Sequence, residues 1–452
     1  MKWSRTRSAK FLAVGAAAAL LLTACGGDSD EGEGTEPDAE APAATDEGEE
    51  ITLTITTFNQ FGYEALYDQY MEENPNITIE ATAIDTGGNA RTDTFTKIAA
   101  GSGLTDIVAL EEGWLGAIME VSDQFADLRD YGIEDRKADW LDWKYAQATD
   151  PSGRVIGYGT DIGPEGICYR PDLFEAAGLP SDREAVAEYL EGDWAHYFDV
   201  GREYTEATGK AWYDHSGFIW NGIVNQMDEG YYTADGELNV VDNADMRANF
   251  DLVAAAVADG LSAGQAVWDW NGGQSFVDGT FATFVCPGWM LGVVEGQVQT
   301  GAEAAGVDPA SVVWDFADVF PGGAANWGGS FLAVAETSEH KEAAAALASW
   351  LTEPEQQLAA FEAAGAFPST VEAAETLAAE ATPRETFNNA PAGAILASRA
   401  QGIQAQFKGP DDSVIQENVF GPALQQLDDG SLDGPGAWDA ALQLLDELVV
   451  NN

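Results

Sequence analysis

Several tryptophans of this sequence stand beside Asn, Asp, Glu or Gly in segments with the composition of loops. A sugar ring offers a flat C–H face that packs on an indole, and its hydroxyls hydrogen-bond to carboxylate and amide side chains. A Trp next to such a side chain therefore supplies both kinds of contact. The pattern predicts a carbohydrate-binding role for Glu112, Trp114, Trp220, Asn221, Trp270, Asn271, Trp289, Trp327, Gly328 and Gly329.

Other positions have an equally good structural interpretation. Asp161 lies in a polar segment between two apolar runs, where it either accepts hydrogen bonds from ligand hydroxyls or caps a turn. Arg170 ends the second of these runs, where an ion pair explains it as well as a ligand does. The remaining tryptophans of helix-like and strand-like segments are assigned to the core or the surface: Trp140, Trp143, Trp194, Trp314, Trp350 and Trp438.

The first elements of the globular chain alternate between strands and helices. Apolar, β-branched runs predict strands over Ile51–Thr57, Ile77–Ile84 and Thr105–Leu110, and the segments Tyr63–Glu73 and Thr92–Ala100 predict helices. This order indicates a parallel α/β sheet, whose ligands bind at the carboxyl ends of the strands. The candidate residues at those ends are Asn59, Phe61, Glu112 and Trp114.

Two segments have the composition expected where the chain passes from one domain to another. Gly153–Pro180 contains two apolar runs joined by the polar, Gly/Pro-broken connection Thr160–Glu165. Pro321–Phe331 is a Gly-rich loop that leads into a predicted strand, Phe331–Ala335. Ser330 lies in this second segment and joins the candidate ligand-binding residues.

Composition limits the class of protein. A chain of 452 residues is too long for one core of ordinary size, which favours two domains. The hydrophobic fraction of 45% and the 14 Trp exclude wholesale disorder. The formal charge of −57 argues against nucleic acid or anionic lipid as a partner of the folded part, because phosphates would be repelled.

The amino terminus has the features of a bacterial lipoprotein signal. Met1–Lys10 is basic, and the apolar run Phe11–Ala24 is too short to span a bilayer. Leu22-Thr23-Ala24-Cys25-Gly26 matches a lipobox, in which the Cys is lipidated and becomes the first mature residue. Gly26–Glu50 is acidic and rich in Gly, Pro and Ala, which predicts a disordered tether. We therefore expect a protein anchored by lipid on the extracellular face of a Gram-positive-type cell membrane.

Signatures of catalysis are missing from the sequence. The three His have no metal-ligand spacing, and no phosphate-binding loop and no Gly-x-Ser-x-Gly motif occur. Carboxylate pairs such as Glu111/Glu112 carry little information in a chain with 77 acidic residues. We expect no enzyme activity, no metal and no cofactor.

Two cysteines remain besides Cys25. Cys168 and Cys286 each lie at the end of a predicted strand, and an extracellular location permits a disulfide between them. The alternative is a pair of buried thiols, because sequence does not place the two Cα atoms within bonding range.

Two stretches resemble one family. The first contains Gly157-Tyr158-Gly159, Asp161, Gly163-Pro164 and the run Tyr-Arg-x-Asp-Leu-Phe-x-x-Ala-Gly-Leu-Pro up to Pro180. The second, Asn326–Ser369, contains Gly-Gly-Ser-Phe-Leu-Ala-Val, Trp-Leu-Thr-x-Pro-Glu-Gln-Gln and Gly-x-Phe-Pro-Ser. Both resemble the hinges of extracellular solute-binding proteins (family 1) of sugar ABC importers, and the greatest likeness is to actinobacterial lipoproteins that bind cello-oligosaccharides.

The resemblance implies a fold and a division of the chain. The fold is α/β, a two-lobed periplasmic-binding-protein-like fold of type II, with hinge-linked lobes around a central ligand cleft. The divisions are a signal peptide (1–24), the lipidated Cys and tether (25–50), lobe one (51–160 and 325–363) and lobe two (161–324 and 364–452).

The function that the resemblance implies is capture of an oligosaccharide, such as cellobiose or cellotriose, and its delivery to the membrane subunits of an ABC permease. Such a protein works as a monomer and contacts the membrane only through its lipid anchor. Two alternatives stay open. One is a secreted glycoside hydrolase or lyase with an aromatic cleft, and the other is a binder of another solute, such as a xylo-oligosaccharide, peptide or polyamine.

Overall fold

The computed structural model describes residues 50–266, 268–379 and 383–451. The predicted signal peptide, the predicted lipidation site Cys25 and nearly all of the predicted tether lie outside these residues. In the described ranges, none of the helices combines the length and the apolar composition that a membrane span requires.

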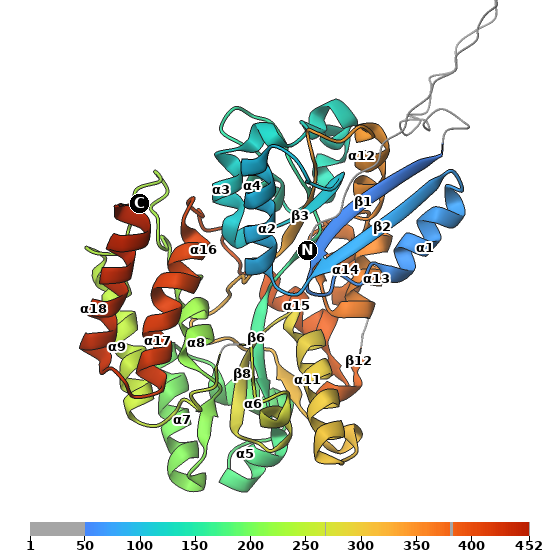
Figure 1. The fold of residues 1–452 in the computed structure, drawn as a ribbon. Coiled ribbons are helices and arrows are strands. Elements are labelled where there is room, and N and C mark those ends of the chain that lie inside the picture. Colours follow the sequence, from blue (N-terminus) through green and yellow to red (C-terminus); the bar gives the residue numbers. More distant parts are fainter. Residues whose placement is uncertain (1–49, 267, 380–382, 452) are drawn as a thin grey trace, which may run out of the picture. The chain divides into compact units, whose positions relative to one another are not determined.

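A five-stranded mixed sheet has the strand order β2–β1–β3–β10–β4. Its strands β1, β2 and β3 are labelled in Figure 1. Its strands are β1 (Ile51–Phe58), β2 (Ile77–Ile84), β3 (Ile107–Glu111), β4 (Tyr158–Gly159) and β10 (Ser330–Val334). β1 is parallel to β2 and β3, as the strand–helix–strand order predicts. β10 is antiparallel to β3, with Ser330 opposite Glu111. The carboxyl end of β3 therefore lies beside the start of β10, although more than 200 residues separate them in sequence.

Several helices lie between or after the strands of this first sheet in the sequence. They are α1 (Glu64–Glu73), α2 (Gly87–Ala100), α3 (Leu115–Met119), α4 (Asp142–Gln147), α12 (Lys341–Trp350) and α13 (Pro354–Ala364). α2 starts earlier than the expected Thr92, because the Thr86 hydroxyl accepts the Asn89 N–H at 3.2 Å and caps the helix. The amino end of α2 consequently follows β2 almost at once.

A four-stranded sheet has the order β7–β8–β6–β9. Its strands are β6 (Glu165–Tyr169), β7 (Ala211–Tyr213), β8 (Phe281–Pro287) and β9 (Asp315–Ala317). β6 and β8 are antiparallel neighbours, and Cys168 of β6 forms a disulfide with Cys286 of β8. The structure thus contains the bridge, one of the two arrangements that the sequence allows.

Most remaining helices surround this second sheet. They are α5 (Pro171–Ala177), α6 (Arg183–Leu190), α7 (Trp194–Thr208), α8 (Ser216–Val224), α9 (Ala244–Ala258), α10 (Gln274–Val277), α11 (Met290–Ala305), α14 (Val371–Ala379), α15 (Ala392–Ala400), α16 (Asp412–Val414), α17 (Gly421–Asp428) and α18 (Gly434–Leu445). π-helical turns over Ile415–Phe420 and Asp446–Val450 extend α16 and α18. α17 and α18 pack side by side (Figure 1).

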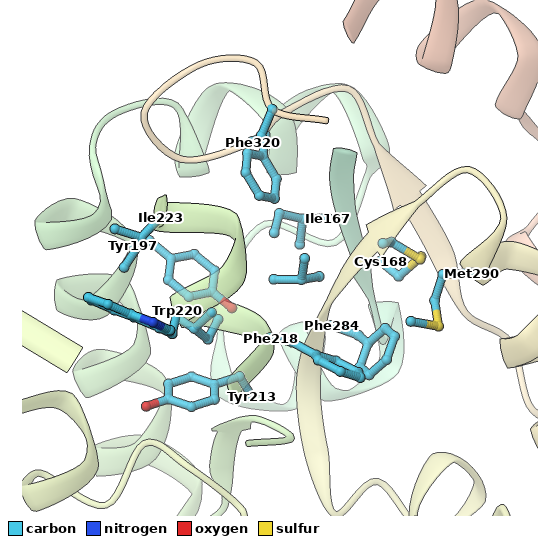
Figure 2. Packing of buried hydrophobic residues seen from close by; sticks show 14 of the residues in the cluster. Ile167, Cys168, Tyr197, Tyr213, Phe218, Trp220, Ile223, Phe284, Met290 and Phe320 are labelled. Atoms are coloured by element: carbon cyan, nitrogen blue, oxygen red, sulfur yellow. A yellow bond between two sulfur atoms is a disulfide. The ribbon is translucent and has the colours of Figure 1, made fainter. Parts of the chain in front are cut away.

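Each sheet has its own hydrophobic core. The first core takes its buried residues from 51–158 and 331–360, and the second takes them from 162–325 and 361–445. Figure 2 shows part of the second core, where Phe218 packs edge-on against Phe284 at a centroid distance of 5.8 Å. We call the two bodies the first and second lobes. The fold is a mixed α/β fold, as expected.

The chain passes between the lobes in three places, and these passages contact each other. β5 (Asp161–Ile162) pairs with β11 (Phe367–Pro368), so the first passage lies against the third. The Asn326 side-chain oxygen accepts the Gly163 N–H at 2.9 Å, which joins the first passage to the second. A Cβ at Gly163 would lie 1.8 Å from the Trp327 carbonyl oxygen, so this approach of two backbones requires glycine.

Candidate ligand-binding cavity

A cavity of about 1210 Å³ is lined by both lobes. The first lobe contributes the ends of β1 and β3 and the start of α2, and the second contributes α8, the loop at Trp268 and α11. The passage that contains Trp327 and the segment that contains Lys408 complete the lining. This location agrees with the rule that ligands of open α/β sheets bind at the carboxyl ends of the strands.

Most residues that the sequence singled out line this cavity. They are Asn59, Phe61, Glu112, Asp161, Asn221, Trp270, Trp289, Trp327, Gly328, Gly329 and Ser330. Three other candidates, Trp114, Trp220 and Asn271, are not among the lining residues. The loop and hinge segments therefore converge on one place from both lobes.

The structure explains why these three side chains do not line the cavity. Trp114 is buried in the first core, where it packs against Phe95. Trp220 is fully buried in the second core, and its indole N–H donates to the Tyr231 hydroxyl at 3.0 Å. Its neighbour Asn221 faces the cavity, because adjacent residues of a helix point about 100° apart. Asn271 is exposed, and its side chain bonds to Gln274 at 3.4 Å.

An aromatic wall consists of Phe218, Trp268, Trp289 and Trp327. The rings of Trp289 and Trp327 meet edge to face at 5.2 Å, and the Trp289 indole N–H donates to the Trp327 carbonyl oxygen at 2.8 Å. Phe218 lies 4.7 Å from Trp327 and 5.3 Å from Trp268. Contacts between rings of four separate segments hold these faces in place, so the wall is preformed.

Trp270 supports this wall from behind. Its side chain is only 1% exposed, and its indole N–H donates to the buried carboxylate of Asp214 at 3.0 Å. Trp268, two residues earlier, is 43% exposed and lines the cavity. The sequence analysis chose Trp270 and missed Trp268, although the alternation of Trp268-Asp269-Trp270 was a signal that one ring is buried and the other exposed.

Carboxylates form the polar part of the cavity at the end of β3. Both oxygens of Glu112 are occupied, since Oε1 accepts from Gln147 at 2.9 Å and Oε2 accepts from Asn326 at 3.1 Å. Glu111 accepts the Gly113 N–H through Oε2 at 3.0 Å, whereas its Oε1 makes no hydrogen bond within the described residues. Sequence reasoning chose Glu112, but Glu111 has the free acceptor.

Asp161 belongs to the first passage between the lobes. Its Oδ1 accepts the Ser330 N–H at 2.9 Å and the Thr160 hydroxyl at 2.6 Å. Burial raises the pKa of Asp161, and the nearby Lys144 opposes this rise. Burial lowers the pKa of Lys144 to about 8, and its ammonium lies 3.7 Å from the centre of the Phe331 ring. Asp161 thus both fixes a turn and presents a carboxyl group to the cavity.

A third group of lining residues comes from the segment between α15 and α17. Lys408 donates to Asn225 at 2.9 Å and lies 3.7 Å from the carboxylate of Asp412. Asn225 in turn donates to Asn221 of the same helix at 3.0 Å. The sequence shows no motif in this segment, so its role was missed.

In the described ranges, no three His, Cys, Asp or Glu residues are grouped so that they would hold a metal ion.

Comparison with known proteins decides the family. The family model "Bacterial extracellular solute-binding protein" matches residues 65–389. The chain belongs to this family. A crystal structure described as an extracellular solute-binding protein of family 1 is 43% identical, with a TM-score of 0.77 and coverage of 88% of this chain and 99% of that one. The family and the two-lobed fold expected from the hinge segments are therefore confirmed.

More distant relatives of this solute-binding protein share its fold. The ABC transporter associated binding protein from B. animalis subsp. lactis Bl-04, in complex with β-1,6-galactobiose, has a TM-score of 0.71 at 18% identity and covers 88% of this chain and 97% of its own. The lactose-binding protein of Rhizobium radiobacter is 25% identical over 245 residues, or 51% of this chain. The chain spans about half the length of that curated relative, 53%.

The state of Glu111 gives a first prediction for the solute-binding protein. Burial raises the pKa of Glu111 to about 8, and the neighbouring Glu112 adds to the rise. The unfolded chain releases this proton near pH 4.5, so the free energy of unfolding falls as the pH rises from 4.5 to 8. Glu111→Gln avoids the ionisation, and we expect it to exceed wild type by about 1–2 kcal/mol at pH 8, a figure reduced for partial exposure.

Urea unfolding of both proteins at pH 4.5 and pH 8 measures this difference. The gap should nearly close at pH 4.5, where the carboxyl of the wild type is protonated in the folded protein and about half protonated in the unfolded chain. Glu112→Gln is the matched control and should lose stability at both pH values. Its amide NH₂ group replaces one oxygen that accepts a hydrogen bond from Gln147 or Asn326, so two donors would face each other. Equal stability of Glu111→Gln and wild type at pH 8 would show that water solvates Glu111 in the empty cavity.

Proposed function

We propose that this chain is the oligosaccharide receptor of an ABC importer. It captures a sugar of two or more rings in the cavity between its lobes and delivers it to the permease subunits in the membrane. Cys25 carries the lipid anchor, and the acidic segment up to Glu50 is the tether. We propose lobe bounds of 51–160 with 325–363 and 161–324 with 364–452, and closure around the sugar by bending at the three passages.

The observation that carries this proposal is the pairing of aromatic faces with free polar groups in one cavity. Trp268, Trp289 and Trp327 offer indole surface, while Glu111 and Asp161 offer carboxyl oxygens. Sugars require this combination, because the C–H faces of a ring are apolar and its hydroxyls are not. Pockets for drug-sized ligands measure about 300–1,000 Å³, and the cavity here, about 1210 Å³, has room for several linked rings.

Relatives support the sugar class. Structural neighbours include complexes with β-1,6-galactobiose and with acarbose, the second in the GacH receptor of Streptomyces glaucescens, and the curated relative is a lactose-binding protein. For the ligand of this chain we propose cellobiose, cellotriose or a similar oligosaccharide, on the likeness of its hinge segments to cello-oligosaccharide binders.

Closure can be explained without any chemistry on the sugar. A ligand that touches both lobes adds contacts in the closed state that the open state lacks, so binding shifts the population toward closure. The proposed receptor therefore has no enzyme activity and needs no cofactor or metal. Like the proteins that its hinge segments resemble, it is proposed to work as a monomer.

Isothermal titration tests the proposal. The purified protein is titrated with cellobiose, cellotriose, xylobiose, maltose and spermidine, and the recovered sugars are examined for cleavage by chromatography. Saturable binding of an intact oligosaccharide is the expected result. Cleavage of the sugar would instead identify a glycoside hydrolase, and heat from spermidine alone would identify a polyamine binder. The absence of heat with every sugar would overturn the sugar assignment.

A further inference from the structure

Trp268 differs from the other aromatic residues of the cavity in exposure. Its side chain is 43% exposed, whereas Phe218 and Trp270 beside it are buried. Contact of a large aromatic side chain with water is unfavourable, and a ligand that covers the ring removes this cost. Trp268 is therefore available for contact with a ligand.

The backbone at Trp268 has a conformation that bulky residues rarely adopt. Its φ is 67°, and Trp270 and Asn271 follow with φ of 36° and 55°. Left-handed conformations in non-glycine residues are unfavourable and persist where the surroundings enforce them, often at ligand-binding sites. Three of them in four residues indicate a loop that is held in place to present a side chain.

Contacts of the residues after Trp268 hold the loop in this conformation. The Trp270 indole is tied to Asp214, and the Ser275 N–H donates to the Trp270 carbonyl oxygen at 3.2 Å. Gly273 packs so closely on α11 that a Cβ there would lie 2.1 Å from the Gln297 carbonyl oxygen. The loop is thus anchored to the core at Trp270 and to a helix at Gly273, while Trp268 remains free to contact a ligand.

The ring of Trp268 lies next to that of Trp289. Their centroids are 6.1 Å apart and their planes differ by 34°, so the two neighbouring indoles have similar orientations. Trp327, in contrast, meets Trp289 at 83° and presents its edge to that ring. Two neighbouring faces of similar orientation match two consecutive rings of one sugar chain.

We propose that Trp268 forms a second stacking subsite next to Trp289, through which the protein distinguishes longer from shorter oligosaccharides. This inference rests on the proposed sugar-binding function. A disaccharide occupies the inner face at Trp289 and the polar groups at Glu111 and Asp161. A third ring extends over Trp268 and covers its exposed indole. Affinity then rises with chain length, and Trp268 is the residue responsible for the rise.

The test compares chain lengths rather than single affinities. Wild type, Trp268→Ala and Phe407→Ala are titrated with the di-, tri- and tetrasaccharide of the series that wild type binds. Phe407 is the matched control, because it is 46% exposed and does not line the cavity. We expect Trp268→Ala to bind the disaccharide within about twofold of wild type and the trisaccharide about tenfold more weakly. Phe407→Ala should match wild type at every length.

Other outcomes overturn the inference in distinguishable ways. An equal loss at all lengths would place Trp268 in the inner subsite, and no loss at any length would make it a surface residue without a ligand contact. If wild type binds no sugar, the proposed function fails together with the subsite. Circular dichroism of each variant checks the fold, and Trp268→Phe, which keeps a ring, should restore part of the length dependence.

Discussion

Removal of the Cys168–Cys286 disulfide is expected to lower the free energy of unfolding of the second lobe by about 4–5 kcal/mol. The bridge joins residues 118 positions apart, and cross-linking so long a loop strongly reduces the conformational freedom of the unfolded chain. Both cysteines are fully buried on neighbouring strands, so the double variant Cys168→Ala/Cys286→Ala keeps the native pairing of β6 and β8. Guanidinium unfolding followed by tryptophan fluorescence measures the difference.

Wild-type protein under a reducing agent is the control for this experiment, since it loses the bridge without losing the sulfur atoms. The first lobe has its own core and contains neither cysteine, so its unfolding should be unaffected if the lobes unfold separately. Unchanged unfolding of the double variant would argue that the bridge is absent or that the unfolded chain is already compact. Two reactive thiols besides that of Cys25 in the unfolded, unreduced protein would decide for absence.

The sequence predicted most of the fold because its signals were local. β-branched alternation located β1 and β2, and an Asn-Pro break and a glycine ended the helices after them. The hinge segments carried a family resemblance, and through it they predicted the two-lobed fold that no local pattern could give. The position of Ser330 opposite Glu111 depends on β10 returning to the first sheet, and only the tertiary structure shows it.

The candidate site was predicted less completely, for reasons that concern side-chain direction. A Trp beside a polar residue met the chemical criterion, but in α8 the polar residue faces the cavity and Trp220 faces the core. In the loop after residue 267 the choice between Trp268 and Trp270 depends on backbone angles that sequence does not specify. Lys408 and Asp412 reach the cavity through packing of distant segments, so no spacing in the sequence could identify them.

The free carboxyl at the end of β3 illustrates the same limit. Glu111 and Glu112 are adjacent and chemically alike, yet their roles differ. Gln147 and Asn326 donate hydrogen bonds to the two carboxylate oxygens of Glu112. Asn326 belongs to the second passage, which the sequence identified by its glycines and by its family resemblance, neither of which pairs Asn326 with Glu112. The partner of a polar side chain, more than its type, decides whether that side chain is available to a ligand.

Trp289→Ala is expected to weaken oligosaccharide binding by about 2–3 kcal/mol, or roughly 30- to 150-fold. The variant removes an indole face from the middle of the aromatic wall, between Trp268 and Trp327. It also removes the indole N–H that holds the Trp327 carbonyl oxygen at 2.8 Å, so the Gly-rich loop of the second passage loses a restraint. Titration with the best-bound sugar, together with thermal unfolding, separates the loss of binding from any loss of stability.

Two further variants show which of these effects matters. Trp289→Phe keeps an aromatic face but cannot donate to Trp327, and an intermediate affinity would assign part of the loss to the restraint. Trp350→Ala removes a partly buried indole that packs on Tyr70 and does not line the cavity, so it should lower stability without changing affinity. Unfolding of Trp289→Ala with unchanged affinity in the folded fraction would assign Trp289 to the core. Because Trp289 immediately precedes α11 and lies between the other indoles, a large binding effect with a small stability effect would identify it as the central stacking face of the site.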